Sequence, residues 1–242
     1  MALDEPEPQQ AAVRWGIGDA LLGTLVTLVV PAIAGIVAFL AAGWEGAADV
    51  PLWGVALLQI PLWAGLLGAP LWATNLKGRR SLAEDFGLRM RWTDVPLGLG
   101  VGLVAQVALG IVVRILYDLL GIDLDKVGES AEQLTESAVD AVGVVLLVLV
   151  VVVAAPVFEE LFYRGLWLRA VARRYGTVVG VLLSSFVFAA IHFQPYDFPA
   201  LFGFALVLAV LTARNGRLGP AIWAHVAFNL TAVVSLLADT ST

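Results

Sequence analysis

The stretch that decides the fold is VVVAAPVFEELFYR, residues 151–164, where two adjacent glutamates, Glu159 and Glu160, follow a long apolar run. From Val142 to Val157 the chain consists almost entirely of Val, Leu and Ala. A charge at the centre of a bilayer costs about 2.5–3.5 kcal/mol on insertion scales, so it is retained where it meets a partner, water or a cation. The stretch therefore predicts a membrane-spanning helix that carries a functional site.

The composition of the whole chain supports a membrane protein. Of its 242 residues 60% are hydrophobic and only 14% are charged, which no soluble globular domain matches. The apolar segments use nearly the full length and leave no room for a separate soluble domain. The absence of cysteine excludes disulfides, thiolate catalysis and cysteine-ligated zinc. We expect an all-α fold, a polytopic transmembrane helical bundle.

Segments long enough to cross a bilayer, about 20 apolar residues each, set the number of spans. Seven are expected, at 17–42, 52–74, 95–116, 139–168, 177–193, 198–212 and 218–238. An eighth arises if 139–174 is split at Pro156. The acidic, proline-containing residues 1–16 lack the basic start of a cleaved signal peptide and are expected to form a disordered tail. Residues 17–238 then form one transmembrane domain, with a core at about 139–238.

The orientation follows from the basic residues, which accumulate in cytoplasmic loops. The outer loop 118–136 carries several acids and a single basic residue, Lys126. Arg114, near the outer end of the third span, is expected to pair with Asp118 one turn later. The N-terminus is placed in the cytoplasm, and the Ala, Val and Gly content favours a bacterial inner membrane. The basic residues assigned to the inner side are Arg14, Lys77, Arg79, Arg80, Arg89, Arg91, Arg169, Arg173, Arg174, Arg214 and Arg217.

Four polar residues fall at similar depths on three different spans. Glu159 and His192 lie about 20 and 25 Å of helix from the basic boundary at residues 173–174, and His225 and Asn229 lie about 12 and 18 Å beyond Arg217. Taken singly, His192 reads as an interfacial residue, and His225 and Asn229 read as ordinary hydrogen-bonding residues between helices. Taken together, their common depth predicts one site.

This set of residues fits amide hydrolysis. A glutamate in a low-dielectric pocket can take a proton from water, and a histidine beside it can orient that water. A second histidine and an asparagine can donate hydrogen bonds to the developing oxyanion. Arg164 lies one turn after Glu160 and is expected to pair with it, which leaves Glu159, rotated by about 100°, free to react.

Two other hydrolase signatures are missing. Ser184 and Ser185 lack the glycine pattern of a nucleophile elbow and read as small packing residues. The zinc-protease sequence His-Glu-x-x-His does not occur in the chain.

The motifs Glu-Glu-x-x-x-Arg (Glu159, Glu160, Arg164), Phe-x-x-x-His (Phe188, His192) and His-x-x-x-Asn (His225, Asn229) occur in this order on separate spans. The ordered set resembles the CPBP family, the CaaX protease and bacteriocin-processing group of intramembrane endopeptidases, also called Abi, which includes the Ras-converting CaaX endopeptidase. The sequence at residues 86–89, FGLR, is also similar to bacterial members.

The resemblance implies an active site inside the membrane. By motif position, Glu159 and His192 activate the water, His225 and Asn229 form the oxyanion site, and Glu160 with Arg164 braces the geometry. The family carries a metalloprotease label, and Glu159, His192 and His225 provide a two-histidine, one-carboxylate set for zinc. We favour chemistry that requires no cofactor, with zinc as the alternative.

The expected partners are the lipid bilayer and a membrane-embedded or membrane-anchored peptide or protein substrate, and no nucleic acid. Two other functions stay open. One is a non-proteolytic membrane scaffold or immunity-type protein. The other is a proton-coupled transporter that uses the Glu and His residues as a relay, although no inverted repeat with paired broken spans is apparent.

The charge pattern generates a topology prediction. A single cysteine at Ser130, in this cysteine-free chain, should be labelled by a membrane-impermeant thiol reagent from the outside, and one at Arg80 only from the cytoplasmic side. Labelling of position 130 from the cytoplasmic side alone would show that the orientation is wrong.

Overall fold

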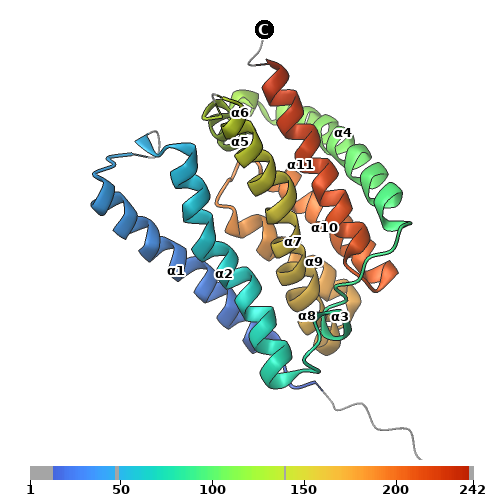
Figure 1. Cartoon of the computed structure of the whole chain (residues 1–242). Coiled ribbons are helices and arrows are strands. Elements are labelled where there is room, and N and C mark those ends of the chain that lie inside the picture. Colours follow the sequence, from blue (N-terminus) through green and yellow to red (C-terminus); the bar gives the residue numbers. More distant parts are fainter. Residues whose placement is uncertain (1–12, 47–48, 139, 240–242) are drawn as a thin grey trace, which may run out of the picture.

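A computed structural model describes residues 13–46, 49–138 and 140–239. Within these ranges all regular secondary structure is helical (Figure 1). The spans come from α1 (Ile17–Ala42), α2 (Leu52–Lys77), α4 (Asp94–Leu120), a continuous helix from Ala141 to Tyr175, α9 (Thr177–Ile191), α10 (Phe198–Asn215) and α11 (Gly219–Asp239). Six of them are long and apolar enough to cross a membrane, and α9 is a shorter apolar helix. The all-α bundle with seven apolar helices is therefore confirmed for the described residues.

Short elements connect these helices at the two ends of the bundle. They are α3 (Leu82–Asp85) between α2 and α4, and η2 (Leu124–Lys126) and α5 (Glu129–Glu136) between α4 and the long helix. The long helix itself consists of α6 (Ala141–Leu147), η3 (Val148–Ala154), α7 (Ala155–Glu159), η4 (Glu160–Trp167) and α8 (Leu168–Tyr175).

Pro156 does not split the long helix into two spans, so the eighth span does not form. The turns before it, η3, are π-helical, and the N–H of Ala155 donates to the carbonyl of Val150, five residues back. In that register residue 156 would donate to the carbonyl of Val151, but proline has no N–H. The Asn229 side chain of α11 supplies the missing donor, with Nδ2 2.8 Å from the Val151 oxygen. A backbone group left unpaired in a membrane is thus satisfied by a neighbouring helix.

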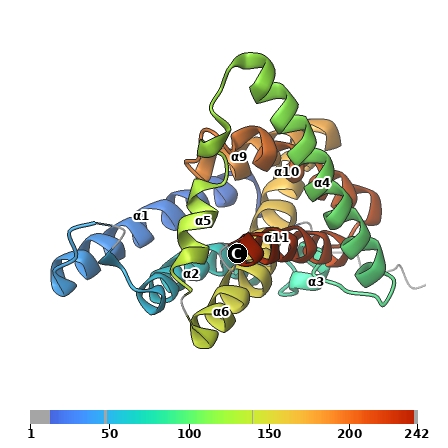
Figure 2. The same ribbon diagram turned by 90° about the horizontal axis from the view of Figure 1, so that it is seen from above.

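The helices pack as two groups. Helix α4 packs along α11 and contacts α10, while α9 lies between α8 and α10. Helices α1 and α2 form a hairpin to one side of this group (Figure 2). The outer face of α1 exposes Leu25, Ile33, Ile36 and Leu40. Because these large apolar residues have no protein partner, that face is suited to contact lipid.

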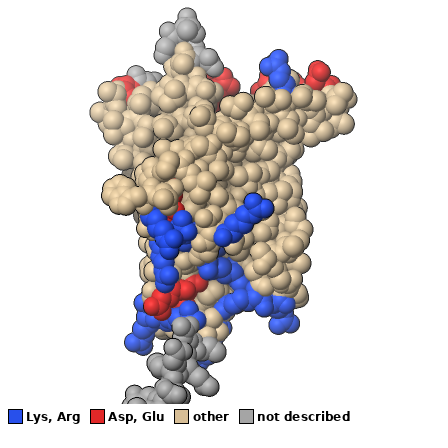
Figure 3. All heavy atoms as spheres, turned by 90° about the vertical axis from the view of Figure 1, so that its right-hand side faces the viewer, with Lys and Arg blue, Asp and Glu red and all other residues tan. Residues whose placement is uncertain are grey.

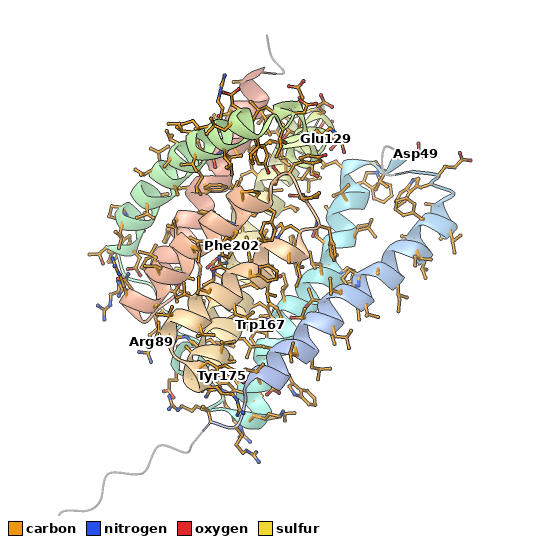
Figure 4. All side chains as sticks on the ribbon, turned by 180° about the vertical axis from the view of Figure 1, so that it is seen from behind. Asp49, Arg89, Glu129, Trp167, Tyr175 and Phe202 are labelled. Atoms are coloured by element: carbon orange, nitrogen blue, oxygen red, sulfur yellow. The ribbon has the colours of Figure 1, made fainter. Side chains whose placement is uncertain are left out.

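Charged residues separate toward the two ends of the bundle. In Figure 3 the Lys and Arg side chains of the visible face gather mainly in its lower half. In Figure 4 Arg89 and Tyr175 lie at one end and Asp49 and Glu129 at the other. This separation agrees with the pattern from which the topology was predicted. The expected pair of Arg114 with Asp118 is wrong: no such ion pair occurs within the described residues.

The packed part of the chain begins earlier than the sequence predicted. Residues 1–12 of the expected tail lie outside the described residues, but residues 13–16 belong to the bundle. The ring of Trp15 is buried, 4.8 Å from that of Phe86, and Arg173 stacks on it at 3.6 Å. The N–H of Arg14 donates to the carbonyl of Lys77 at 2.7 Å. Hydropathy alone assigns these residues to the tail because they precede the apolar run.

Two glycines bring α4 close to α11. A Cβ at Gly98 would overlap the Cβ of Trp223, and a Cβ at Gly102 would overlap the carbonyl oxygen of Ala224 and lie 2.8 Å from the Cβ of Ala227. Small residues permit this kind of close helix approach in membranes, where packing replaces the hydrophobic effect between helices.

We therefore expect Gly102→Ala to lower the free energy of unfolding by about 1–3 kcal/mol, because the added methyl group meets backbone that cannot move aside easily. Gly100→Ala, two residues away, is the matched control: its Cβ meets nothing within 4 Å. That change should leave stability unchanged or raise it slightly. Thermal unfolding of both variants in detergent checks the prediction, and equal melting temperatures would contradict it.

Candidate active site

A cavity of about 760 Å³ lies inside the bundle, with walls from α2, α4, α5, the long helix, α10 and α11 and the end of α9. Four of the residues singled out in the sequence, Glu159, His192, His225 and Asn229, line it. Phe188 lines it too, whereas Glu160 and Arg164 lie behind the wall and are fully buried. The structure thus brings together residues from three spans, as their common depth predicted.

Glu160 is held by two partners. Its Oε1 accepts a hydrogen bond from Arg164 Nη1 at 2.8 Å, within the π-helical segment η4, and another from His225 Nδ1 of α11 at 2.9 Å. The expected i, i+4 ion pair is therefore present. An isolated charge in such an environment would be very costly, and the pairing offsets that cost. The same carboxylate connects the long helix to α11.

Arg164 also reaches two other helices. Its Nη2 donates to the carbonyl of Ala205 on α10 at 3.2 Å, and its guanidinium lies over the ring of Phe188, 4.5 Å from the centroid. The Phe188 ring lies 4.6 Å from that of His192 and 6.0 Å from that of His225. Phe188 therefore does more than fill space, since it separates the buried ion pair from His192 and fixes the positions of the rings around it.

Glu159 differs from Glu160 in its surroundings. Its side chain is 17% exposed, against none for Glu160, and it faces the cavity. Its Oε2 lies 3.8 Å from Nε2 of His225, the ring atom that Glu160 leaves free. Two adjacent glutamates are thus placed differently by the helix: one holds the fold together and one is available for chemistry.

His192 lies where α9 ends. Its Nδ1 is 2.6 Å from the carbonyl oxygen of Phe188. A carbonyl only accepts, so Nδ1 carries a proton, and in the neutral ring Nε2 is then an acceptor. Phe193, the next residue, adopts a left-handed conformation with φ of 54°, which turns the chain away from the helix.

Asp197 closes the turn that follows. Its Oδ1 accepts from the N–H of Gly128 at 2.8 Å, which attaches the segment before α5 to the His192 loop. Burial raises the pKa of the Asp197 carboxyl, and the Gly128 hydrogen bond and the nearby His192 partly offset that shift. Asp197 also lines the cavity. No motif in the sequence had indicated it as a site residue.

Asn229 makes a hydrogen bond between helices, which is one of the two roles that the sequence suggested for it. One N–H of its amide donates to Val151 on the long helix, as an interhelical hydrogen bond. The second N–H of the amide remains, because an asparagine carries two donors. Since Asn229 lines the cavity, this second donor is available to a ligand there.

The zinc alternative gains no geometric support. Residues 13–46, 49–138 and 140–239 contain no group of three or more His, Asp or Glu side chains placed to hold a metal ion. One nitrogen of each histidine is already used, His225 Nδ1 by Glu160 and His192 Nδ1 by the Phe188 carbonyl.

Sequence reasoning also missed Gln59 on α2, Gln106 on α4 and Tyr163 on the long helix, all of them polar residues of the cavity wall. The signal that would have found the first two is a glutamine inside a membrane span, since such residues are expensive there. Tyr163 follows Glu159 by four residues and packs edge-on against Phe188, 5.1 Å away.

Comparison with family models matches residues 141–231 to a family described as Type II CAAX prenyl endopeptidase Rce1-like. The matched segment begins with α6 and ends within α11, so it contains all four polar candidates and the buried ion pair. It leaves out α1 and also α2, α4 and α5, which supply part of the cavity wall. No curated protein and no solved structure matches the chain.

The buried ion pair generates a stability prediction. Arg164→Ala leaves the Glu160 carboxylate buried without its strongest partner, so the free energy of unfolding should fall by about 3–5 kcal/mol. Arg174→Ala, an exposed arginine of the same helix, should change it by less than about 0.5 kcal/mol. The double variant Glu160→Gln with Arg164→Met, which removes both charges of the pair, should recover part of the loss.

Thermal unfolding of the three variants in detergent measures these differences. A melting temperature of Arg164→Ala equal to that of the unaltered protein would show that the pair does not stabilise the fold.

Proposed function

Because the chain belongs to the CaaX protease family through residues 141–231, we propose that it is an intramembrane endopeptidase in which Glu159 activates water. The observation that carries this proposal is the position of Glu159: it faces a cavity inside the bundle, with His225 beside it. The family supports a membrane protease in general. The roles of individual residues below are our own assignment.

The charges of the site balance when His225 carries both ring protons. Glu160 pairs with Arg164, and Glu159 then pairs with the imidazolium of His225, so two anions meet two cations. A neutral set of this kind avoids an uncompensated buried charge. His225 then donates from Nδ1 to Glu160 and keeps Nε2–H for a ligand, which the oxyanion role requires.

Hydrolysis begins with a water molecule between the catalytic residues and the substrate carbonyl. Glu159 takes a proton from this water molecule, while His192 orients the water through Nε2, which acts as an acceptor. The water oxygen forms a bond to the carbonyl carbon. The negative charge on the carbonyl oxygen is stabilised by His225 Nε2–H and by the second N–H of Asn229, the first being held by Val151.

The tetrahedral intermediate collapses with cleavage of its C–N bond. Glu159, now protonated, gives its proton to the leaving amine, so that one water is consumed and the glutamate is regenerated. Glu160 and Arg164 stay paired throughout and keep His225 in place. No covalent intermediate and no nucleophilic side chain is required.

Metal-free chemistry is our preference, and zinc held by Glu159, His192 and His225 is the alternative. In that case the metal would polarise the carbonyl and lower the proton affinity of water. Only with zinc bound in this way would the protein be classed as a metalloendopeptidase.

The substrate we propose is membrane-embedded or membrane-anchored. The cavity wall is mainly apolar, with residues such as Leu62, Leu109 and Val233. A peptide reaching it meets helices that lie within the membrane, so an apolar chain next to the cleaved bond is favoured. From the distribution of basic residues and the composition, we propose that this multi-pass chain lies in the inner membrane of a bacterium with its N-terminus in the cytoplasm.

The decisive experiment compares cleavage by purified protein with that by Glu159→Gln. This change keeps the size of the side chain but removes the base, so turnover should fall by about 10²–10⁴-fold while the melting temperature is retained. The probe is a quenched fluorescent peptide ending in a prenylated CAAX sequence. Glu136→Gln, the same change at an exposed carboxylate of α5, is the control and should leave turnover unchanged.

Chelators added to the same assay separate the two chemistries. Cleavage that survives strong chelation supports the metal-free route, and loss of cleavage that added Zn²⁺ reverses supports the zinc alternative. A fully active Glu159→Gln protein would contradict both routes and favour the scaffold or transporter function.

A further inference from the structure

Gln106 on α4 is an unpaired polar group in the wall of the cavity. Its Oε1 is buried without a hydrogen-bond partner, and its side chain makes no hydrogen bond within the described residues. The neighbouring wall residue Leu109 is apolar. A buried amide that is left unpaired costs free energy, and more so inside a membrane. Gln106 lies outside the segment that matches the family model.

The packing of α4 on α11 fixes the level at which Gln106 lies. Both helices begin at the same end, where Arg217 Nε donates to Asp94 Oδ1 at 3.0 Å and the N–H of Gly219 donates to the carbonyl of Arg89 at 3.2 Å. One turn on, a Cβ at Gly98 would meet Trp223 and Ala224, and a further turn on, a Cβ at Gly102 would meet Ala224 and Ala227. The two helices therefore run parallel and in step.

The next turn of α4 carries Gln106 and the next turn of α11 carries Asn229. Each lies 12 residues beyond its partner in the Asp94–Arg217 pair, about 18 Å along the helix. Both side chains line the same cavity. Gln106 is consequently level with the residue to which we assign the oxyanion role.

We infer that Gln106 binds the backbone of the substrate next to the bond that is cleaved, an inference that rests on the proposed endopeptidase function. A glutamine amide offers one acceptor and two donors, which match the N–H and C=O of an extended peptide. Oε1 accepts from a substrate N–H and Nε2 donates to a substrate carbonyl. The interaction holds the peptide in place whatever its side chains are.

An internal comparison supports a ligand rather than a structural role. Asn229, Glu160 and Arg164 each have a hydrogen-bond partner on another helix or within their own. Gln106 has none, and among the described residues with a buried unpaired side-chain atom it is the one that lines the cavity. A polar group that destabilises the fold and makes no stabilising contact is characteristic of a binding site.

The test begins with Gln106→Leu, which has nearly the same size and removes the unpaired group. Its melting temperature should equal or exceed that of the unaltered protein. Its kcat/KM on the prenylated CAAX peptide should fall about 10-fold or more, mainly through KM, because the lost contact binds ground state and transition state alike. Gln133→Leu, at an exposed glutamine of α5 outside the cavity, is the matched control and should match the unaltered protein.

A second measurement names the bonded group on the substrate. In a series of probes, each amide flanking the cleaved bond is replaced in turn by an ester, which removes one N–H. One replacement should weaken cleavage by the unaltered protein about 10-fold and should have no further effect on Gln106→Leu, as a pair of interacting groups requires. Equal effects on both proteins at every position would overturn the inference.

Binding of the same peptide to the Glu159→Gln protein, with and without Gln106→Leu, separates the two proposals. Binding weakened about 10-fold by Gln106→Leu supports the inference even where the unaltered protein does not cleave, an outcome that contradicts only the proposed function. Unweakened binding, unchanged kcat/KM, or no binding to either protein overturns it. A lower melting temperature of Gln106→Leu together with normal KM would assign Gln106 a structural role instead.

Discussion

The buried carboxylate of Glu160 is the constraint on which the rest of the site depends. It lies without solvent contact between Arg164 and His225, and Arg164 in turn reaches the backbone of α10. Such a charge persists in a membrane protein only while its partners stay in place, so it fixes three helices relative to one another. The cavity-facing side of each helix is then determined. Glu159 is displaced from this arrangement by a single residue, and for that reason it faces the cavity rather than the ion pair.

A second constraint comes from the backbone around Pro156. Proline has no N–H to donate within the long helix. In the π-helical register, the acceptor left without a donor is the carbonyl of Val151. In lipid that carbonyl must find a donor, and Asn229 provides it. The same asparagine therefore links α11 to the long helix and lines the cavity. The bond to Val151 restrains the amide, as the oxyanion role that we propose for it requires.

The sequence predicts well what depends on local spacing or average composition. Hydropathy locates the seven apolar helices, and a separation of four residues predicts the pair of Glu160 and Arg164. It fails where non-local contacts decide. Trp15 precedes the apolar run yet packs on Phe86, and Arg114 does not pair with Asp118 although the spacing allows it. The hydrogen bond of Asn229 with Val151 depends on a π-helical register, which no residue pattern in the sequence predicts. The sequence marks Gln106 as a glutamine inside a membrane span, but its level relative to Asn229 follows only from the close approach of α4 to α11.

Inside a membrane the polar groups of this protein divide into two kinds. Those with a protein partner hold helices together, as Glu160, Arg164 and one N–H of Asn229 do. Those that face the cavity, among them Glu159 (whose Oε2 has only the 3.8 Å contact with His225), His192 Nε2 and the amide of Gln106, can bond to water or a substrate. Lipid cannot satisfy either kind, so an unpaired group that faces the cavity is suited to bind a ligand. The three groups come from the long helix, α9 and α4, and only the first two lie within the segment that the family model matches. The chemistry that we propose is therefore concentrated in residues 141–231, while part of the proposed binding surface is supplied by helices outside the segment that the family model matches.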